Sequence, residues 1–224
     1  MKTVFLQKNG GEKLLVFFNG WSRSAADAAA LKAPSDVLEV HDYTVLDSAE
    51  LFAQIAPYPN ISLVAWSLGV WAAAAVFEHS PVRFELALAL NGTLYPVHPE
   101  YGIAPEIFDG TIANWLIPAA RDRFLRRMAG SAAAAQSLPE TGRSPEDQQT
   151  ELAAIRKQAA ERPVPHDLYT HAVLGRQDRI IPFAAQENFW KTRSDTKIIT
   201  ADLPHYPFAG CSEWTKFPGV ENAG

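Results

Sequence analysis

The sequence predicts an α/β protein built around a mainly parallel β-sheet. β-rich segments alternate with helical segments toward both ends of the chain, which is the pattern of strand–helix–strand units. An apolar run at residues 61–66 passes directly into a helical stretch, as at the carboxyl end of a parallel strand. The 224 residues suit one domain with a substantial core, and the 47% apolar and 20% charged content is typical of globular proteins.

The first part of the chain carries two β-rich runs, an alanine-rich helix signal, a strand signal and a second helix signal. These lie at residues 3–7, 13–18, 25–31, 36–40 and 48–55, with Asp47 as the possible N-cap of the second helix. Between the two β-rich runs stands Asn9-Gly10-Gly11, which predicts a hairpin.

The junction between strand and helix at Ser67 is the central signal of the sequence. A strand that becomes a helix at a single serine is typical of the nucleophile elbow, whose usual pattern is G-x-S-x-G. Here the pentapeptide is Ala65-Trp66-Ser67-Leu68-Gly69, so an alanine adds one methyl group at the first small position. Taken alone, the pentapeptide fits the start of an ordinary core helix equally well.

After a strand signal at residues 84–90 and the tripeptide Asn91-Gly92-Thr93, the alternation stops. Residues 94–165 contain no β-branched run and predict loops and helices, one of them at residues 118–128. A later helix is predicted from Ser144 as N-cap and Pro145 at its first position. We therefore predict a single domain over residues 1–224, with residues 94–165 inserted as a helical lid.

Sheet signals resume at residues 168–174 and 197–201, with a helix signal at residues 183–192 between them. Asp178 follows the first of these strands and His205 follows the second. The order Ser67, Asp178, His205 is the chain order of the catalytic triad in α/β-hydrolases. Asp202, three residues before His205, is the alternative acid.

Two backbone N–H groups are candidates for stabilising an oxyanion. The strand at residues 13–18 ends in Asn19-Gly20-Trp21, and in a hydrolase with a nucleophile elbow this loop supplies one donor, here the Trp21 N–H. The second donor is the N–H of Leu68, directly after the nucleophile. The Asn19-Gly20-Trp21 turn alone fits a simple strand cap as well.

Several classes of function are disfavoured. Residues 1–20 contain no continuous apolar region of a signal peptide, and no apolar run is long enough to span a bilayer, so we expect a cytoplasmic protein without a membrane partner. A single cysteine, Cys211, excludes an internal disulfide. The net charge of −5 argues against nucleic-acid binding. No metal-ligand spacing or phosphate-binding loop is present, so no metal and no cofactor is expected.

Residues 111–130 form a locally basic stretch. Four arginines, Arg121, Arg123, Arg126 and Arg127, stand against the single acid Asp122. The last three share one helix face at i, i+3 and i+4 spacing. This face is either an ordinary solvated surface or a contact site for an acidic partner or a substrate carboxylate.

Together, several of these motifs resemble the BioG family of pimeloyl-[acyl-carrier protein] methyl ester esterases. The motifs are N-G-W at 19–21, A-W-S-L-G-V-W-A-A at 65–73, N-G-T at 91–93 with Pro96 and Gly102 beyond, G-x-x-D at 175–178 and H-Y-P-F at 205–208. The resemblance implies an α/β-hydrolase of biotin synthesis that acts on an ester carried by acyl carrier protein, with the triad named above. A broader carboxylesterase or thioesterase would share every motif.

Overall fold

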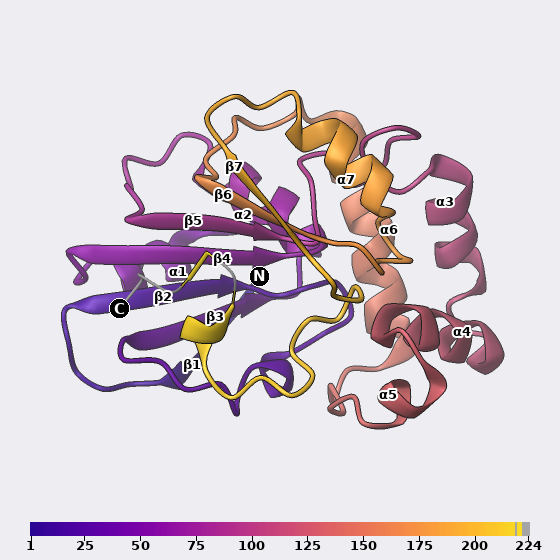
Figure 1. The fold of residues 1–224 in the computed structure, drawn as a ribbon, viewed down its shortest axis with the longest axis horizontal. Helices are drawn as coiled ribbons and strands as arrows, with labels where there is room; N and C mark the ends of the chain where they lie inside the picture. Colours follow the sequence, from indigo (N-terminus) through magenta and orange to yellow (C-terminus); the bar gives the residue numbers. More distant parts are fainter. Residues whose placement is uncertain (218, 221–224) are drawn as a thin grey trace.

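One seven-stranded sheet forms the core of the computed structural model, which describes residues 1–217, 219 and 220 (Figure 1). The strand order is β1-β3-β2-β4-β5-β6-β7, and every neighbouring pair is parallel except β1 with β3. The strands are β1 (Lys2–Gln7), β2 (Lys13–Phe18), β3 (Asp36–His41), β4 (Asn60–Trp66), β5 (Leu86–Leu90), β6 (His171–Gly175) and β7 (Lys197–Ala201). The predicted α/β class with a mostly parallel sheet is confirmed.

The predicted hairpin between the first two strands is wrong. Strand β1 pairs with β3, because β2 already has parallel neighbours on both sides, β3 and β4. The turn at Asn9 and Gly10 instead caps the start of β3: both N–H groups donate to Asp36 Oδ1, at 2.5 and 3.0 Å. A turn sequence can therefore connect two strands that do not pair with each other.

Helices cover one face of the sheet. These are α1 (Ala49–Ile55), α2 (Leu68–Phe77) and α7 (Phe183–Trp190). Phe18 of β2 contacts Phe77 of α2, and Tyr169 joins α2 to α7 by donating to Val70 O and packing on Trp190. Successive residues of a strand point to opposite faces of the sheet, so Phe17 faces away from these helices.

On the opposite face, Phe17 packs against Phe208 and Trp214 of the C-terminal segment. The regular elements described there are two short 3₁₀-helices, η1 (Ala25–Asp27) and η2 (Trp214–Lys216). The alanine-rich helix predicted over residues 25–31 is thus limited to one turn, where Asp27 pairs with Arg23. Its alanine content favours a helix, but tertiary contacts decide the conformation.

Residues 94–165 contain four helices and lie beyond the carboxyl ends of the strands (Figure 1). They are α3 (Pro105–Asn114), α4 (Pro118–Ala129), α5 (Ala132–Gln136) and α6 (Pro145–Glu161). The predicted N-cap of α6 is confirmed, because Ser144 Oγ accepts a hydrogen bond from the Asp147 N–H. Within the described residues, no helix has both the length and the apolar character needed to cross a membrane.

Candidate active site

Ser67 occupies a strained turn between β4 and α2. Its backbone has φ 60° and ψ −128°, a conformation that residues other than glycine rarely adopt. Two close backbone approaches hold the turn: a Cβ at Gly69 would lie 2.5 Å from Asn19 O, and one at Gly92 would lie 2.4 Å from Ser67 O. The Ser67 N–H also donates to Leu90 O at 2.9 Å. This is the predicted elbow geometry, which lifts the serine side chain beyond the end of the sheet.

The structure brings the predicted serine, histidine and acid together in one hydrogen-bonded chain. His205 Nδ1 lies 2.7 Å from Asp178 Oδ2, and His205 Nε2 lies 2.8 Å from Ser67 Oγ. Because an ionised carboxylate can only accept, Nδ1 carries the proton and Nε2 accepts from the serine hydroxyl. All three residues are buried. The serine can therefore pass its proton to the imidazole without a change of geometry.

The Asp178 carboxylate is fixed by groups on its own side of the site. Its Oδ1 accepts from the N–H groups of Ile180 and Ile181, at 2.8 and 3.1 Å, and Oδ2 also accepts from Gln186 Nε2 at 2.9 Å. The alternative acid, Asp202, is exposed and accepts from Gln177 instead. Sequence reasoning missed Gln186, because one glutamine within a short helix carries no recognisable pattern.

The loop that carries His205 is anchored through its backbone. The carbonyl oxygen of His205 accepts from Trp66 Nε1 at 2.7 Å and from Asn91 Nδ2 at 3.1 Å. Asn91 Oδ1 in turn accepts from the Gly175 N–H, at the end of β6. Asn91 is fully buried, so the strand-end asparagine noted in the sequence joins the ends of β5 and β6 to the histidine loop.

Trp21 and Leu68, the two predicted oxyanion donors, line the same cavity as Ser67 and His205. Among the described residues, neither backbone N–H has a hydrogen-bond partner, so both are free to bind a ligand oxygen. Gly20 makes room for this arrangement, because a Cβ there would lie 2.8 Å from the Trp66 ring.

The cavity over Ser67 is small, with a volume of about 20 Å³, and its lining is mostly apolar. Side chains of the helical segment supply much of its wall: Ile103, Phe108, Phe124, Met128 and Leu152. Such a lining suits an aliphatic acyl chain better than a charged group.

Two buried carboxylates that the sequence analysis did not single out lie on either side of the loop at residues 19–24. Glu39 of β3 accepts from Asn19 Nδ2 at 2.9 Å, and its other oxygen lies 2.8 Å from His41 Nδ1. Glu151 of α6 accepts from Arg143 at 2.7 Å. Burial raises the pKa of Glu151 above the usual carboxyl value, and the positive charge of Arg143 offsets part of this effect.

The four arginines of α4 have different surroundings. Arg121 is half-buried and donates to Trp115 O at 2.8 Å, whereas Arg127 donates to Arg179 O. The side chains of Arg123 and Arg126 are exposed and make no hydrogen bond or ion pair with any described residue. The structure therefore leaves two of the four arginines available on the surface of α4.

The fold, with a serine at the strand–helix turn and a histidine and an aspartate after the last two strands, defines an α/β-hydrolase. A bromoperoxidase from Bacillus anthracis has a similar fold, with a TM-score of 0.64 and 18% identity over 88% of this chain and 86% of that chain. The chain belongs to the pimeloyl-ACP methyl esterase family BioG, whose family model matches residues 1–217.

Two relatives show how far this similarity extends. The crystal structure of BioG from Haemophilus influenzae matches with a TM-score of 0.85 and 31% identity, over 96% of this chain and 98% of that one. A protein of Bacteroides fragilis (strain 638R) described as malonyl-[acyl-carrier protein] O-methyltransferase is 36% identical over 198 residues. That match covers 87% of this chain but only 40% of the Bacteroides protein.

Proposed function

We propose that this protein is a serine esterase that hydrolyses the methyl ester of pimeloyl-acyl carrier protein, a step of biotin synthesis. The observation that carries the proposal is the hydrogen-bonded chain Ser67–His205–Asp178 in a member of the pimeloyl-ACP methyl esterase family. The Bacteroides relative adds support. The segment similar to this chain is part of a longer protein that is named for methylating a carrier-linked acid. Removing such a methyl group is the chemically complementary step.

The reaction would pass through an acyl-enzyme on Ser67. Ser67 Oγ attacks the ester carbonyl carbon while His205 Nε2 accepts the hydroxyl proton, and the imidazolium then donates it to the departing methoxide. Methanol leaves, and a water molecule, activated by the same nitrogen, releases the free carboxylate. The Trp21 and Leu68 N–H groups would stabilise the oxyanion of each tetrahedral intermediate, an effect of about 3–4 kcal/mol for one donor in a known protease.

The helical segment at residues 94–165 would act as the lid over this site, since it supplies the apolar wall of the cavity. The exposed Arg123 and Arg126 would then contact the acidic surface of the carrier protein, with Arg121 and Arg127 supporting the same face. A charge-reversed variant of all four arginines should act normally on a small methyl ester but poorly on the carrier-linked one. Wild-type activity of this variant on the carrier-linked ester would contradict this role.

The deciding experiment is hydrolysis of methyl-pimeloyl carrier protein by the wild type and by Ser67→Ala, followed by mass spectrometry of the carrier. Loss of one methyl group with the thioester linkage intact, abolished in Ser67→Ala, is the expected result. Cleavage at the carrier instead would indicate a thioesterase. Activity restricted to free esters would indicate a broader carboxylesterase, which the same apolar cavity can also serve.

A further inference from the structure

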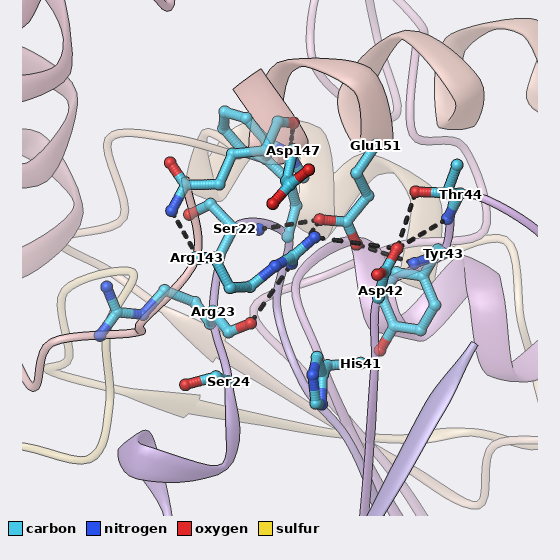
Figure 2. Close-up of polar contacts among 12 residues, drawn as sticks. Ser22, Arg23, Ser24, His41, Asp42, Tyr43, Thr44, Arg143, Asp147 and Glu151 are labelled. Atoms are coloured by element: carbon cyan, nitrogen blue, oxygen red, sulfur yellow. Dashed lines mark hydrogen bonds and ion pairs between the residues drawn. The ribbon is translucent and has the colours of Figure 1, made fainter. Parts of the chain in front are cut away.

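The loop at residues 19–24, which carries the Trp21 N–H, is tied to helix α6 by a buried carboxylate (Figure 2). Glu151 Oε2 lies 2.7 Å from an Arg143 nitrogen and 3.4 Å from the Ser22 N–H nitrogen, and Oε1 accepts from the Tyr43 N–H at 2.8 Å. Glu151 is fully buried, and it therefore connects the ends of β2 and β3 to a helix more than 100 residues later in the chain.

Gln148, one turn earlier on α6, contacts the same loop. Its carbonyl oxygen accepts from Trp21 Nε1 at 2.7 Å, and its side-chain Nε2 donates to Ser22 O at 3.2 Å. Helix α6 therefore contacts the indole of Trp21 and both backbone groups of Ser22. These contacts restrict the Trp21 side chain and the backbone of the next residue, Ser22.

Ser22 adopts φ 68°, a left-handed conformation that a serine keeps only when its surroundings impose it. Gly20 on the other side of Trp21 would by itself leave the loop flexible. Within the loop, Asn19 Nδ2 donates to Ser24 O and the Arg23 N–H donates to Gly20 O. The contacts from α6 add to these bonds and hold Ser22 in its left-handed conformation.

A buried ion pair is a costly way to gain stability. The side chains of Arg143 and Glu151 are only 8% and 0% exposed, and removing two charges from water offsets much of their attraction. Apolar residues of similar size would stabilise the fold about as well. The pair is better explained by the geometry it imposes: Arg143 holds Glu151 and also lies 3.4 Å from Arg23 O of the loop.

We propose that Glu151, held in place by Arg143, is a positioning residue that keeps the Trp21 N–H directed at the oxyanion. The inference rests on the proposed function of Ser67 as the nucleophile. It predicts that breaking the ion pair weakens transition-state stabilisation and leaves substrate binding nearly intact.

Glu151→Gln is the first test, because an amide has only one acceptor oxygen, so its NH2 group must face either the Tyr43 N–H or the Arg143 and Ser22 donors. We expect kcat to fall by about 10- to 100-fold with KM changed by less than about threefold, since a misdirected donor loses part of the oxyanion effect. The rate of Ser67 modification by a fluorophosphonate should fall by a similar factor. A normal kcat and a normal modification rate in the folded variant would overturn the inference.

A double variant, Arg143→Met with Glu151→Met, guards against unfolding by an unpaired buried charge. It should fold, and it should show the same loss of kcat and of fluorophosphonate reactivity. The matched control is Asp109→Asn, which removes an exposed ion pair with Arg156 on the same helix and should leave both rates unchanged. A folded double variant with wild-type rates would overturn the inference. Wild type that forms no Ser67 adduct would instead overturn the proposed function, and the inference with it.

Discussion

The elbow around Ser67 and the loop at residues 19–24 lie side by side at the carboxyl ends of neighbouring strands, but different kinds of contact hold them in place. The strands that precede them are neighbours, with Phe18 of β2 opposite Ala65 of β4. The loop and the elbow each contain a serine with a positive φ, Ser22 and Ser67. The elbow is held by close backbone packing at Gly69 and Gly92. The loop is held by hydrogen bonds to distant elements: to the carboxylates of Glu39 and Glu151 and to the backbone carbonyl of Gln148.

The two proposed oxyanion donors are therefore positioned by different kinds of contact. Leu68 is positioned by a turn that packs closely against Gly69, its neighbour in the chain, and against Gly92 at the end of β5. Trp21 depends on Glu39, which holds Asn19, and on Glu151, which lies 129 residues from its contact Ser22. We therefore expect substitutions to affect the elbow through sterics and the loop through hydrogen bonding.

The largest expected effect comes from the acid that orients the histidine over the elbow. Asp178→Asn should lower kcat by about 10⁴-fold, because the amide favours the wrong tautomer of His205. Asp202→Asn is the matched control and should retain activity, since Asp202 bonds to Gln177 and not to His205. Steady-state kinetics of both variants decides between the two acids, and a reversed result would make Asp202 the acid.

Gly69→Ala tests whether the elbow is held by sterics. The new methyl group would lie 2.5 Å from Asn19 O and 2.6 Å from Phe18 O, so the elbow and the loop would have to separate. We expect about 1–3 kcal/mol lower free energy of unfolding and a loss of kcat on the order of 100-fold. Gly110→Ala in α3 has open space and should stabilise the protein by about 0.5–1 kcal/mol. Denaturant unfolding of both variants measures the contrast.

A pair of tryptophans sharpens the description of the loop. Trp21 and Trp115 pack together, and each donates its indole N–H to Gln148. Replacing either by phenylalanine should cost about 1 kcal/mol of stability from the lost hydrogen bond. Only Trp21→Phe should also lower kcat, by about 3- to 10-fold, because it loosens the loop that carries an oxyanion donor. Equal kcat values in the two variants would show that the indole contact does not position the loop.

The smallest effect is expected at the opposite end of the sheet, where Tyr58 donates to Asp36 Oδ2 at 2.6 Å. Burial alone would raise the pKa of Asp36, but the hydrogen bonds from Tyr58, Asn9 and Gly10 lower it. The same contact raises the pKa of Tyr58 to about 12. Tyr58→Phe should cost about 1 kcal/mol at neutral pH without changing kcat.

The pH dependence of the stability difference between wild type and Tyr58→Phe follows from the pKa shifts of Asp36 and Tyr58. The contribution of Asp36 to folding stability is present above the pKa that Asp36 has in the unfolded chain. It is lost as the pH falls through the lowered pKa of the folded protein. The contribution of Tyr58 is present below pH 10 and is lost as the pH rises toward 12. The stability gap between wild type and Tyr58→Phe should therefore narrow at both extremes. Tyr95→Phe, whose hydroxyl bonds to no described residue, should show no gap.

Local patterns account for what could be predicted from the sequence. The sequence signals for the elbow, the N-cap Ser144 and the strand over residues 197–201 each lie within a short stretch of the chain, and the structure has each of these features. The order of Ser67, Asp178 and His205 was predictable because the carboxyl ends of parallel strands meet at one edge.

Distant contacts account for what could not be predicted. Strand β1 pairs with β3 because β3 and β4 already occupy both sides of β2. The sequence of the turn between β1 and β2 does not reveal this. Glu39, Glu151 and Gln186 resemble ordinary polar residues in the sequence, and only the folded chain reveals that they are buried. Their partners lie 20, 129 and 8 residues away, respectively, so neither spacing nor composition marks them.

The 138-residue separation between Ser67 and His205 has a consequence for how activity arises during synthesis. Contacts this far apart close late, because the intervening chain must first be ordered. A growing chain contains Ser67 long before it contains His205, and β7, which precedes the histidine, lies at the outer edge of the sheet. If Ser67 and His205 act as proposed, we expect Ser67 to react with esters only once β7 and the histidine loop are in place, so that its reactivity would report the completion of folding.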